Sequence, residues 1–175
     1  PNGRYMAWES MEREGYEADK IRLYVMDLTT GEKNDFSEGF DQNAEGLKWG
    51  DDNTIWFISD WHATDEIYSL DIPTGRITKH TDGVHNYTSV IPTGKMLLAT
   101  KVSMSKPAEI YKVDPATGKD EELSFVNKPI LDQLTMGKVE KRWIKTTDNK
   151  DMLVWMIYPP HFDPNRKYPA ILYCE

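Results

Sequence analysis

The chain has 175 residues and a formal net charge of -8, with 39% hydrophobic, 11% aromatic and 29% charged residues. This composition is that of a globular protein with enough apolar side chains to form a core. The negative charge disfavours nucleic acid as a partner, because that affinity comes mainly from Lys and Arg side chains at phosphates. No apolar run reaches the roughly 18 residues of a transmembrane helix, so we expect no membrane span.

One nine-residue sequence motif, called here the repeated phrase, occurs three times along the chain, at residues 23–31, 67–75 and 110–118. Each copy has Tyr as its second residue, Asp as its fifth and Thr-Gly at its end, and the final glycines lie 44 and 43 residues apart. A repeat of about 40 to 50 residues is typical of the four-stranded blades of a β-propeller. We therefore predict an all-β protein that contains a partial β-propeller of about three blades.

The first copy begins inside a blade. Residues 1–6 match the turn at residues 92–97, which joins the first two strands of the third copy. We therefore expect the first blade to lack its innermost strand, and the chain to be a fragment of a longer protein. Open blade edges would then favour self-association.

The second and third copies show the strand pattern more fully. Residues 54–59 form an apolar strand that we expect to be buried on both faces. In the third copy the expected strands are residues 87–91, 95–100, 108–113 and 121–125. The turn before each fourth strand ends in Gly, which tolerates a positive φ, and contains an Asp that can accept backbone N–H groups. The repeated tyrosines are expected to pack between neighbouring blades.

The periodicity stops after Asn127, and a different domain is expected to follow. Residues 138–145 and 152–158 read as two strands, and residues 170–174 form a further apolar strand. We predict that residues 1–135 are propeller blades and that residues 136–175 begin a second domain.

The segment that starts the second domain carries a specific resemblance. Tyr-Pro-Pro-His-Phe-Asp at residues 158–163, then Lys-Tyr-Pro at residues 167–169 and an apolar strand, resembles the start of the α/β-hydrolase domain in prolyl oligopeptidase family serine peptidases. In that family, which includes dipeptidyl peptidases and acylaminoacyl peptidases, a β-propeller precedes the hydrolase domain, as the repeats precede the tail here. The resemblance extends over essentially the whole chain.

This resemblance implies the function of the parent protein. It would be a serine peptidase that releases dipeptides or acyl-amino acids from peptide N-termini, with a propeller that restricts substrate access. Residues 136–175 would be the first strands of a truncated α/β-hydrolase domain. The partners would be peptide substrates, and a bacterial periplasmic location is compatible with the family, although the single Cys174 leaves the compartment undetermined.

The chain itself lacks the motif that carries the nucleophile. No G-x-S-x-G occurs, so a serine at a sharp strand-to-helix turn is missing. None of the four histidines, His62, His80, His85 and His161, has a serine at motif spacing. A metal site at His80 and His85 would need a third ligand. We expect no catalytic residue, cofactor or metal in this chain and predict that the chain alone is inactive.

The resemblance also suggests where substrate would bind. Propellers of dipeptidyl peptidases supply acidic residues for the free amine, and Glu12 and Glu14 lie on an extended acidic hairpin, although a solvated hairpin tip is the simpler reading. Trp61 occupies the equivalent hairpin of the next blade. Glu175 falls at the edge of the oxyanion loop, where some relatives have a tyrosine, and an ionised carboxylate cannot donate that hydrogen bond.

Two other functions fit the repeats. A stand-alone propeller could act as a binding or interaction module, but the tail at residues 138–175 is not the further blade that such a protein would have there. The same hydrolase fold also supports esterases, because a fold does not determine a reaction.

Overall fold

The computed structural model of the chain describes residues 1–13, 15–16 and 18–174. It consists mainly of β-strands, with one short helix in the described residues, and it divides into two compact units, Pro1–Lys128 and Pro129–Glu175. The all-β fold class predicted from the sequence is confirmed at this level.

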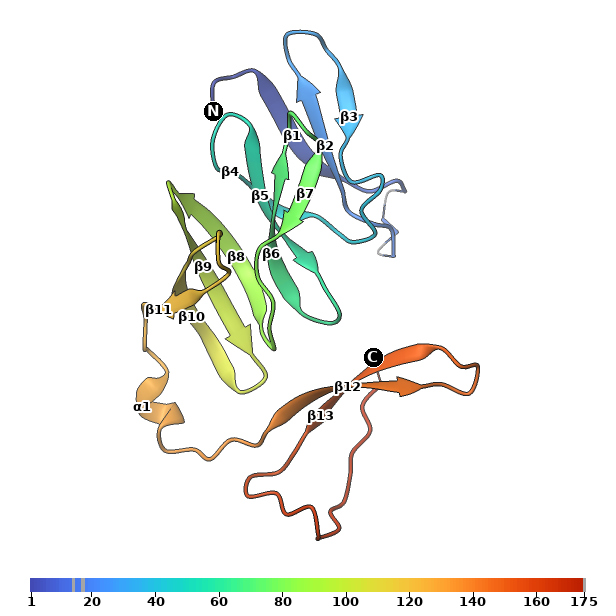
Figure 1. The fold of residues 1–175 in the computed structure, drawn as a ribbon, viewed down its shortest axis with the longest axis vertical. Coiled ribbons are helices and arrows are strands. Elements are labelled where there is room, and N and C mark those ends of the chain that lie inside the picture. Colours follow the sequence, from blue (N-terminus) through green and yellow to red (C-terminus); the bar gives the residue numbers. More distant parts are fainter. Residues whose placement is uncertain (14, 17, 175) are drawn as a thin grey trace. The chain divides into compact units, whose positions relative to one another are not determined.

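The first unit contains three antiparallel meanders, in which each strand pairs with the next one along the chain (Figure 1). The first meander consists of β1 (Tyr5–Ser10), β2 (Arg22–Asp27) and β3 (Lys33–Asp35). The second consists of β4 (Glu45–Trp49), β5 (Thr54–Asp60), β6 (Asp65–Asp71) and β7 (Arg76–Lys79). The third consists of β8 (Asn86–Thr93), β9 (Met96–Ser103), β10 (Lys106–Val113) and β11 (Asp120–Glu122).

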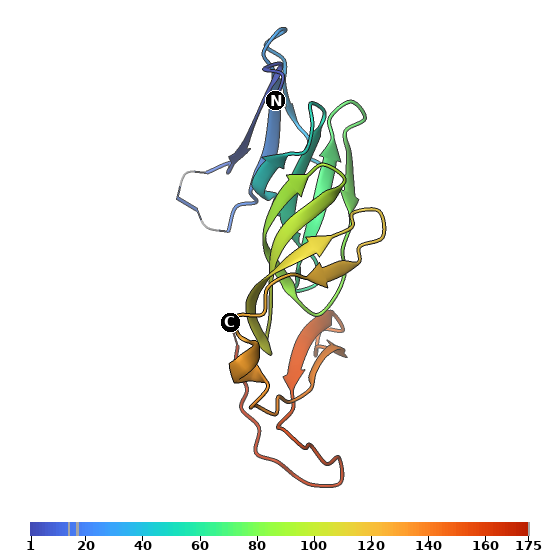
Figure 2. The same ribbon diagram turned by 90° about the vertical axis from the view of Figure 1, so that its left-hand side faces the viewer.

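The second and third meanders are joined where β8 meets the start of β6, a strand that also pairs with β5 and β7. One parallel pair, Asp65 of β6 with Asn86 of β8, links them into an eight-stranded sheet. Figure 2 shows this sheet from the side, with its strands strongly twisted.

The repeated phrase forms the same turn in all three meanders. Gly31, Gly75 and Gly118 have φ values of 76°, 70° and 71°, which favour a residue without a Cβ atom. The N–H group of each glycine donates to the carbonyl oxygen four residues earlier at 2.8 Å. In the first copy, the Asp27 carboxylate accepts the N–H group of Thr29 at 2.8 Å, and this bond lowers its pKa. The predicted role of the repeated Gly is confirmed in all three copies. The predicted role of the Asp is confirmed in the first and third copies, whereas Asp71 accepts the hydroxyl of Thr74.

Two hydrophobic cores lie on opposite faces of the second meander. Leu23 of β2 packs with Phe57 of β5 in the first core, and Ile67 of β6 packs with Val90 of β8 in the second. Side chains of β5 alternate between the two, because successive residues of a strand point to opposite faces. The prediction that residues 54–59 are buried on both faces is confirmed.

The repeated tyrosines do not all pack in the same way. Tyr68 belongs to the first core and Tyr111 to the second, as expected of residues between adjacent sheets. Tyr24 instead stacks on its cross-strand neighbour Trp8 within the first meander, with ring centroids 5.5 Å apart.

The second unit contains little regular structure. After α1 (Lys128–Leu131), which begins at the unit boundary, come β12 (Val139–Lys145) and β13 (Asp151–Ile157), which pair as an antiparallel hairpin. The expected strand at residues 170–174 is absent, because no described strand pairs with it and Ile171 is 97% exposed. Among the described residues, no helix has the length and apolar character needed to cross a membrane.

Candidate functional site

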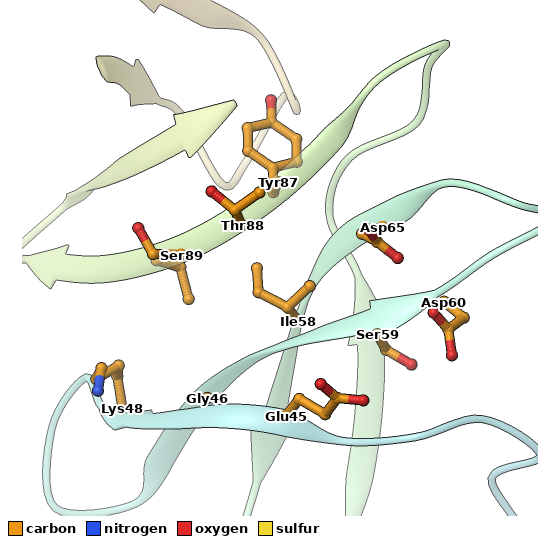
Figure 3. A pocket seen from close by; sticks show the side chains of 11 residues that line it. Glu45, Gly46, Lys48, Ile58, Ser59, Asp60, Asp65, Tyr87, Thr88 and Ser89 are labelled. Carbon is orange, nitrogen blue, oxygen red and sulfur yellow. The ribbon is translucent and has the colours of Figure 1, made fainter. Parts of the chain in front are cut away.

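A pocket of about 430 Å³ lies where the second meander meets the third (Figure 3). Residues from four strands line it: Glu45, Gly46, Lys48, Ile58, Ser59, Asp60, Asp65, Tyr87, Thr88, Ser89 and Val90. The carboxylates of Glu45, Asp60 and Asp65 gather at one end of the pocket, whereas Lys48 lies at the other. The negative charge of the pocket is therefore concentrated at one end, and we call it the acidic pocket.

Strand pairing explains why the three carboxylates meet. Asp60 ends β5 and Asp65 begins β6, and the two residues pair across the hairpin between these strands. Glu45 begins β4, where it pairs with Ile58 of β5, two residues before Asp60. Residues that are 15 and 5 positions apart in the sequence thus come together at one end of a sheet.

The two strands that face each other over the pocket are both irregular. In β4 the pairing with β5 shifts between Glu45 and Lys48, and in β8 the pairing with β9 shifts between Tyr87 and Ser89. A β-bulge of this kind bends the strand and changes where its side chains point. Bulges are common beside active sites for this reason, and here they shape both walls of one pocket.

Two of these carboxylates, Asp65 and Glu45, have raised pKa values. Burial raises the pKa of Asp65 to about 6, and a hydrogen bond with the Asp60 carboxyl and the negative charges of Asp60 and Glu45 add to the effect. Burial also raises the pKa of Glu45, with smaller contributions from Asp60 and Glu9. Crowded carboxylates of this kind are stabilised by a bound cation, and such perturbed groups are typical of functional sites.

The predicted binding residues lie elsewhere. Glu12 forms an ion pair with Arg22 at 2.7 Å on the surface. Trp61 lies in a second pocket of about 550 Å³, beside Phe40 and Tyr68, with the Lys79 amino group 4.4 Å from its ring centroid. Glu14 and Glu175 lie outside the described residues. Neither Glu12 nor Trp61 lines the acidic pocket, so the structure does not bring them together with it.

The sequence contains one signal for the acidic pocket. Asp60 and Asp65 stand at the two ends of the short Trp61–Thr64 hairpin, in which the backbone N–H of Trp61 donates to the Thr64 carbonyl at 2.6 Å. Carboxylates placed symmetrically about a tight hairpin must face each other across it. Glu45 had no comparable signal, because its position depends on the pairing of β4 with β5.

The two histidines considered for a metal have structural contacts. The ring nitrogens of His80 lie 2.8 Å from Ser69 Oγ and 2.7 Å from the Pro115 carbonyl oxygen. His85 Nε2 lies 3.5 Å from a carboxylate oxygen of the buried Glu66. Among the described residues, no group of three or more His, Cys, Asp or Glu side chains is arranged to hold a metal ion.

Comparison with known proteins identifies relatives over the whole chain. The chain is 42% identical to dipeptidyl-peptidase 5 of Porphyromonas gingivalis over 176 aligned residues, which cover 100% of this chain and 26% of that protein. Over its whole length, this chain is therefore similar to dipeptidyl-peptidase 5. The protein of the same name from Porphyromonas endodontalis is also 42% identical to it. The chain therefore spans about a quarter of the length of these dipeptidyl-peptidase 5 relatives. No family model matches it.

Solved structures of peptidases share the fold of this chain. An acylaminoacyl peptidase in complex with Z-Gly-Gly-Phe-chloromethyl ketone matches 95% of this chain and 25% of its own, with a TM-score of 0.76 and 20% identity. The β-propeller domain of the Trilobed protease from Pyrococcus furiosus matches 73% of this chain and 37% of its own, with a TM-score of 0.58 and 19% identity. The resemblance to prolyl oligopeptidase family peptidases that the sequence indicated is confirmed.

Proposed function

We propose that this chain is the substrate-selecting part of a serine peptidase that releases dipeptides from peptide N-termini. Residues 1–135 would supply blades of a β-propeller, and residues 136–175 would supply the first strands of an α/β-hydrolase domain. The observation that carries the proposal is the cluster of Glu45, Asp60 and Asp65 at one end of a pocket, in a chain similar to dipeptidyl-peptidase 5.

The pocket has the chemistry that recognition of a free N-terminus requires. The α-amino group of a peptide is largely protonated at neutral pH, and three neighbouring carboxylates favour a cation of that size. An enzyme that releases dipeptides must measure two residues from the N-terminus, and fixing the amine in place performs that measurement. An acylated N-terminus carries no charge and gains nothing from the carboxylates, so the pocket favours dipeptidyl over acylaminoacyl substrates.

The cleavage step would use groups that this chain does not contain. In the parent protein a serine would attack the scissile carbonyl, with a histidine as base and an acid to orient it. Glu175 would stand at the edge of the oxyanion loop. Glu12, Glu14 and Trp61 would form further contacts with substrate, and Glu12 and Trp61 lie outside the lining of the acidic pocket.

The full-length protein that contains this chain tests the proposal. Its kcat/KM would be measured for a fluorogenic dipeptide amide with a free N-terminus and for its N-acetylated form. Glu45→Gln and Asp60→Asn should each raise KM for the free-amine substrate about 10- to 100-fold, since a hydrogen-bonded charge contributes roughly 1.5–3 kcal/mol. Turnover of the acetylated substrate should not change.

Matched variants separate this site from its alternatives. Glu38→Gln, which removes an exposed carboxylate outside the pocket, should leave both substrates unaffected. If Glu12→Gln raises KM for the free-amine substrate and Glu45→Gln does not, the amine binds at the outer hairpin instead. Rapid hydrolysis of simple esters, with no effect of Glu45→Gln on any substrate, would support the esterase alternative and contradict the proposal.

A further inference from the structure

A carboxylate of the first meander does not line the acidic pocket but is hydrogen-bonded to a strand that does. Glu9 lies on β1, and its Oε1 atom accepts the backbone N–H of Gly46 at 2.8 Å and that of Leu47 at 3.2 Å. Both amides belong to β4 of the second meander. A single side-chain oxygen therefore joins the first meander to β4 of the second meander, the strand that carries Glu45 in the pocket.

These two amides lie where the strand ladder is interrupted. The pairing of β4 with β5 passes from Glu45, opposite Ile58, to Lys48, opposite Trp56, so residues 46 and 47 stand opposite Phe57 alone. A bulge leaves backbone groups without their ladder partners, and a backbone N–H without a partner is costly when it is not solvated. Gly46 is exposed and Leu47 is half-buried, so the alternative acceptor for their amides is water. The Glu9 carboxylate takes the place of that water as a fixed acceptor at the bulge.

The bulge in turn determines where Glu45 points. Gly46 has a φ of 70°, in the left-handed region, so the chain bends directly after Glu45. If β4 straightened, its register on β5 would slip by one residue, and alternate side chains would exchange faces. Glu45 would then no longer share the pocket with Asp60 and Asp65.

We propose that Glu9 is a positioning residue for the acidic pocket, because its carboxylate holds the β4 bulge and so keeps Glu45 directed at the ligand. The part of this inference that concerns the ligand rests on the proposed function. The part that concerns the bulge does not. Glu9 acts through hydrogen bonds to two backbone amides, and its negative charge is not what the bulge requires.

Hydrogen exchange in the full-length protein tests the structural part. Glu9→Ala removes the acceptor, and exchange of the amides in a peptide covering residues 45–48 should become about tenfold faster, as expected from the loss of roughly 1.5 kcal/mol of hydrogen bonding. Glu9→Gln keeps a side-chain oxygen at the same place and should retain near wild-type protection. The control Glu38→Ala should change nothing. Unaltered exchange in Glu9→Ala would overturn the proposal.

Steady-state kinetics with the free-amine dipeptide substrate test the functional part. Glu9→Ala should raise KM as much as Glu45→Gln does and leave kcat unchanged, whereas Glu9→Gln should behave like the wild type. The double variant Glu9→Ala/Glu45→Gln should be no worse than Glu45→Gln alone, because both changes remove the same contact. Equal damage from Glu9→Ala and Glu9→Gln, or additive losses in the double variant, would show that Glu9 acts by its own charge and would contradict the positioning role.

The two proposals fail in different ways. If Glu45→Gln has no effect on KM, the proposed amine site is wrong, and the exchange rates of the Gly46 and Leu47 amides still decide whether Glu9 holds the bulge. If the Glu9→Ala protein is too unstable to measure, Glu9→Asp provides the same comparison, since its shorter side chain cannot reach both amides. Normal protection of both amides in Glu9→Asp would overturn the proposal.

Discussion

Asp65 lines the acidic pocket, and its ionised form there is costly to stability. Its pKa is raised to about 6, because it is partly buried and shares a hydrogen bond with Asp60 among other negative charges. A carboxyl with a raised pKa in the folded protein favours the native state while it is protonated. That contribution is fully present below the unfolded value near 3.8 and is lost as the pH rises through about 6.

We therefore expect Asp65→Asn to stabilise the protein at pH 8 and to have little effect at pH 4. The asparagine amide can donate to Asp60 at every pH and carries no charge, so the gain at pH 8 should be on the order of 1–2 kcal/mol after allowance for solvent screening. Thermal unfolding of the wild type and the variant between pH 4 and pH 8 measures it, with Glu38→Gln as the control. The same gain at all pH values would show that Asp65 is not the titrating group.

The residues chosen from the sequence and those that form the acidic pocket differ for a physical reason. Glu12 and Glu14 are two positions apart in the sequence, so their combined charge is visible there. Glu45, Asp60 and Asp65 are separated along the chain, and only the pairing of β4, β5 and β6 brings them together. Charges that are close in the sequence can be recognised there, whereas the charges of this pocket come together only through the register of the paired strands.

At the scale of elements, Glu109 on β10 fixes the segment that leaves the third meander. It is only 3% exposed, and its carboxylate accepts a hydrogen bond from Ser124 Oγ and from the Asn127 backbone and side-chain nitrogens at 2.9 and 3.0 Å. The bond from Ser124 is the main cause that lowers the pKa of Glu109 to about 2. Residues 124–127 are thus tied to the sheet by one buried side chain.

Glu109→Gln should therefore lower the Tm at neutral pH and speed amide exchange over residues 124–127. A lowered pKa stabilises the native state above the ordinary value of 4.5, and this contribution is lost as the pH falls through about 2. The difference in Tm between wild type and variant should accordingly shrink in acid. Glu121→Gln, which removes an exposed carboxylate on β11, is the control. A Tm difference that does not depend on pH would show that the loss comes from packing.

Some elements were predicted correctly from the sequence, whereas the fourth strand of the third copy was predicted too long. The repeated turns and the buried strand at 54–59 depend on neighbours in sequence, and they were predicted correctly. The fourth strand of the third copy was expected at residues 121–125 but ends at Glu122, because the hydroxyl of Ser124 accepts the Ile110 N–H and takes the place of a backbone carbonyl. Competition of this kind between a side chain and the ladder is not visible in a hydrophobic pattern.

At the scale of the whole molecule, selection and cleavage are expected to be separable. The sequence has no G-x-S-x-G, and the chain covers about a quarter of its dipeptidyl-peptidase 5 relatives. We expect the purified 175-residue chain to hydrolyse no dipeptidyl or acyl-aminoacyl substrate and to react with no serine-directed phosphonate. Parallel assays of the full-length protein provide the positive control. Turnover that persists through repurification and is abolished by the phosphonate would contradict this expectation.

Strand pairing gives the pocket a further property. Glu45 and Ser89 occupy equivalent places in two copies of the repeat. Glu45 pairs with Ile58, which pairs with Ile67, the first residue of the second copy of the repeated phrase. Ser89 pairs with Thr100, which pairs with Ile110, the first residue of the third copy. The two equivalent residues line the pocket from opposite sides, one as an acid and the other as an alcohol (Figure 3). Duplication has therefore supplied matching backbone positions with different side chains. Evolution can change what such a pocket accepts by single substitutions at these positions, while the hydrogen-bond ladders that maintain the fold are inherited unchanged.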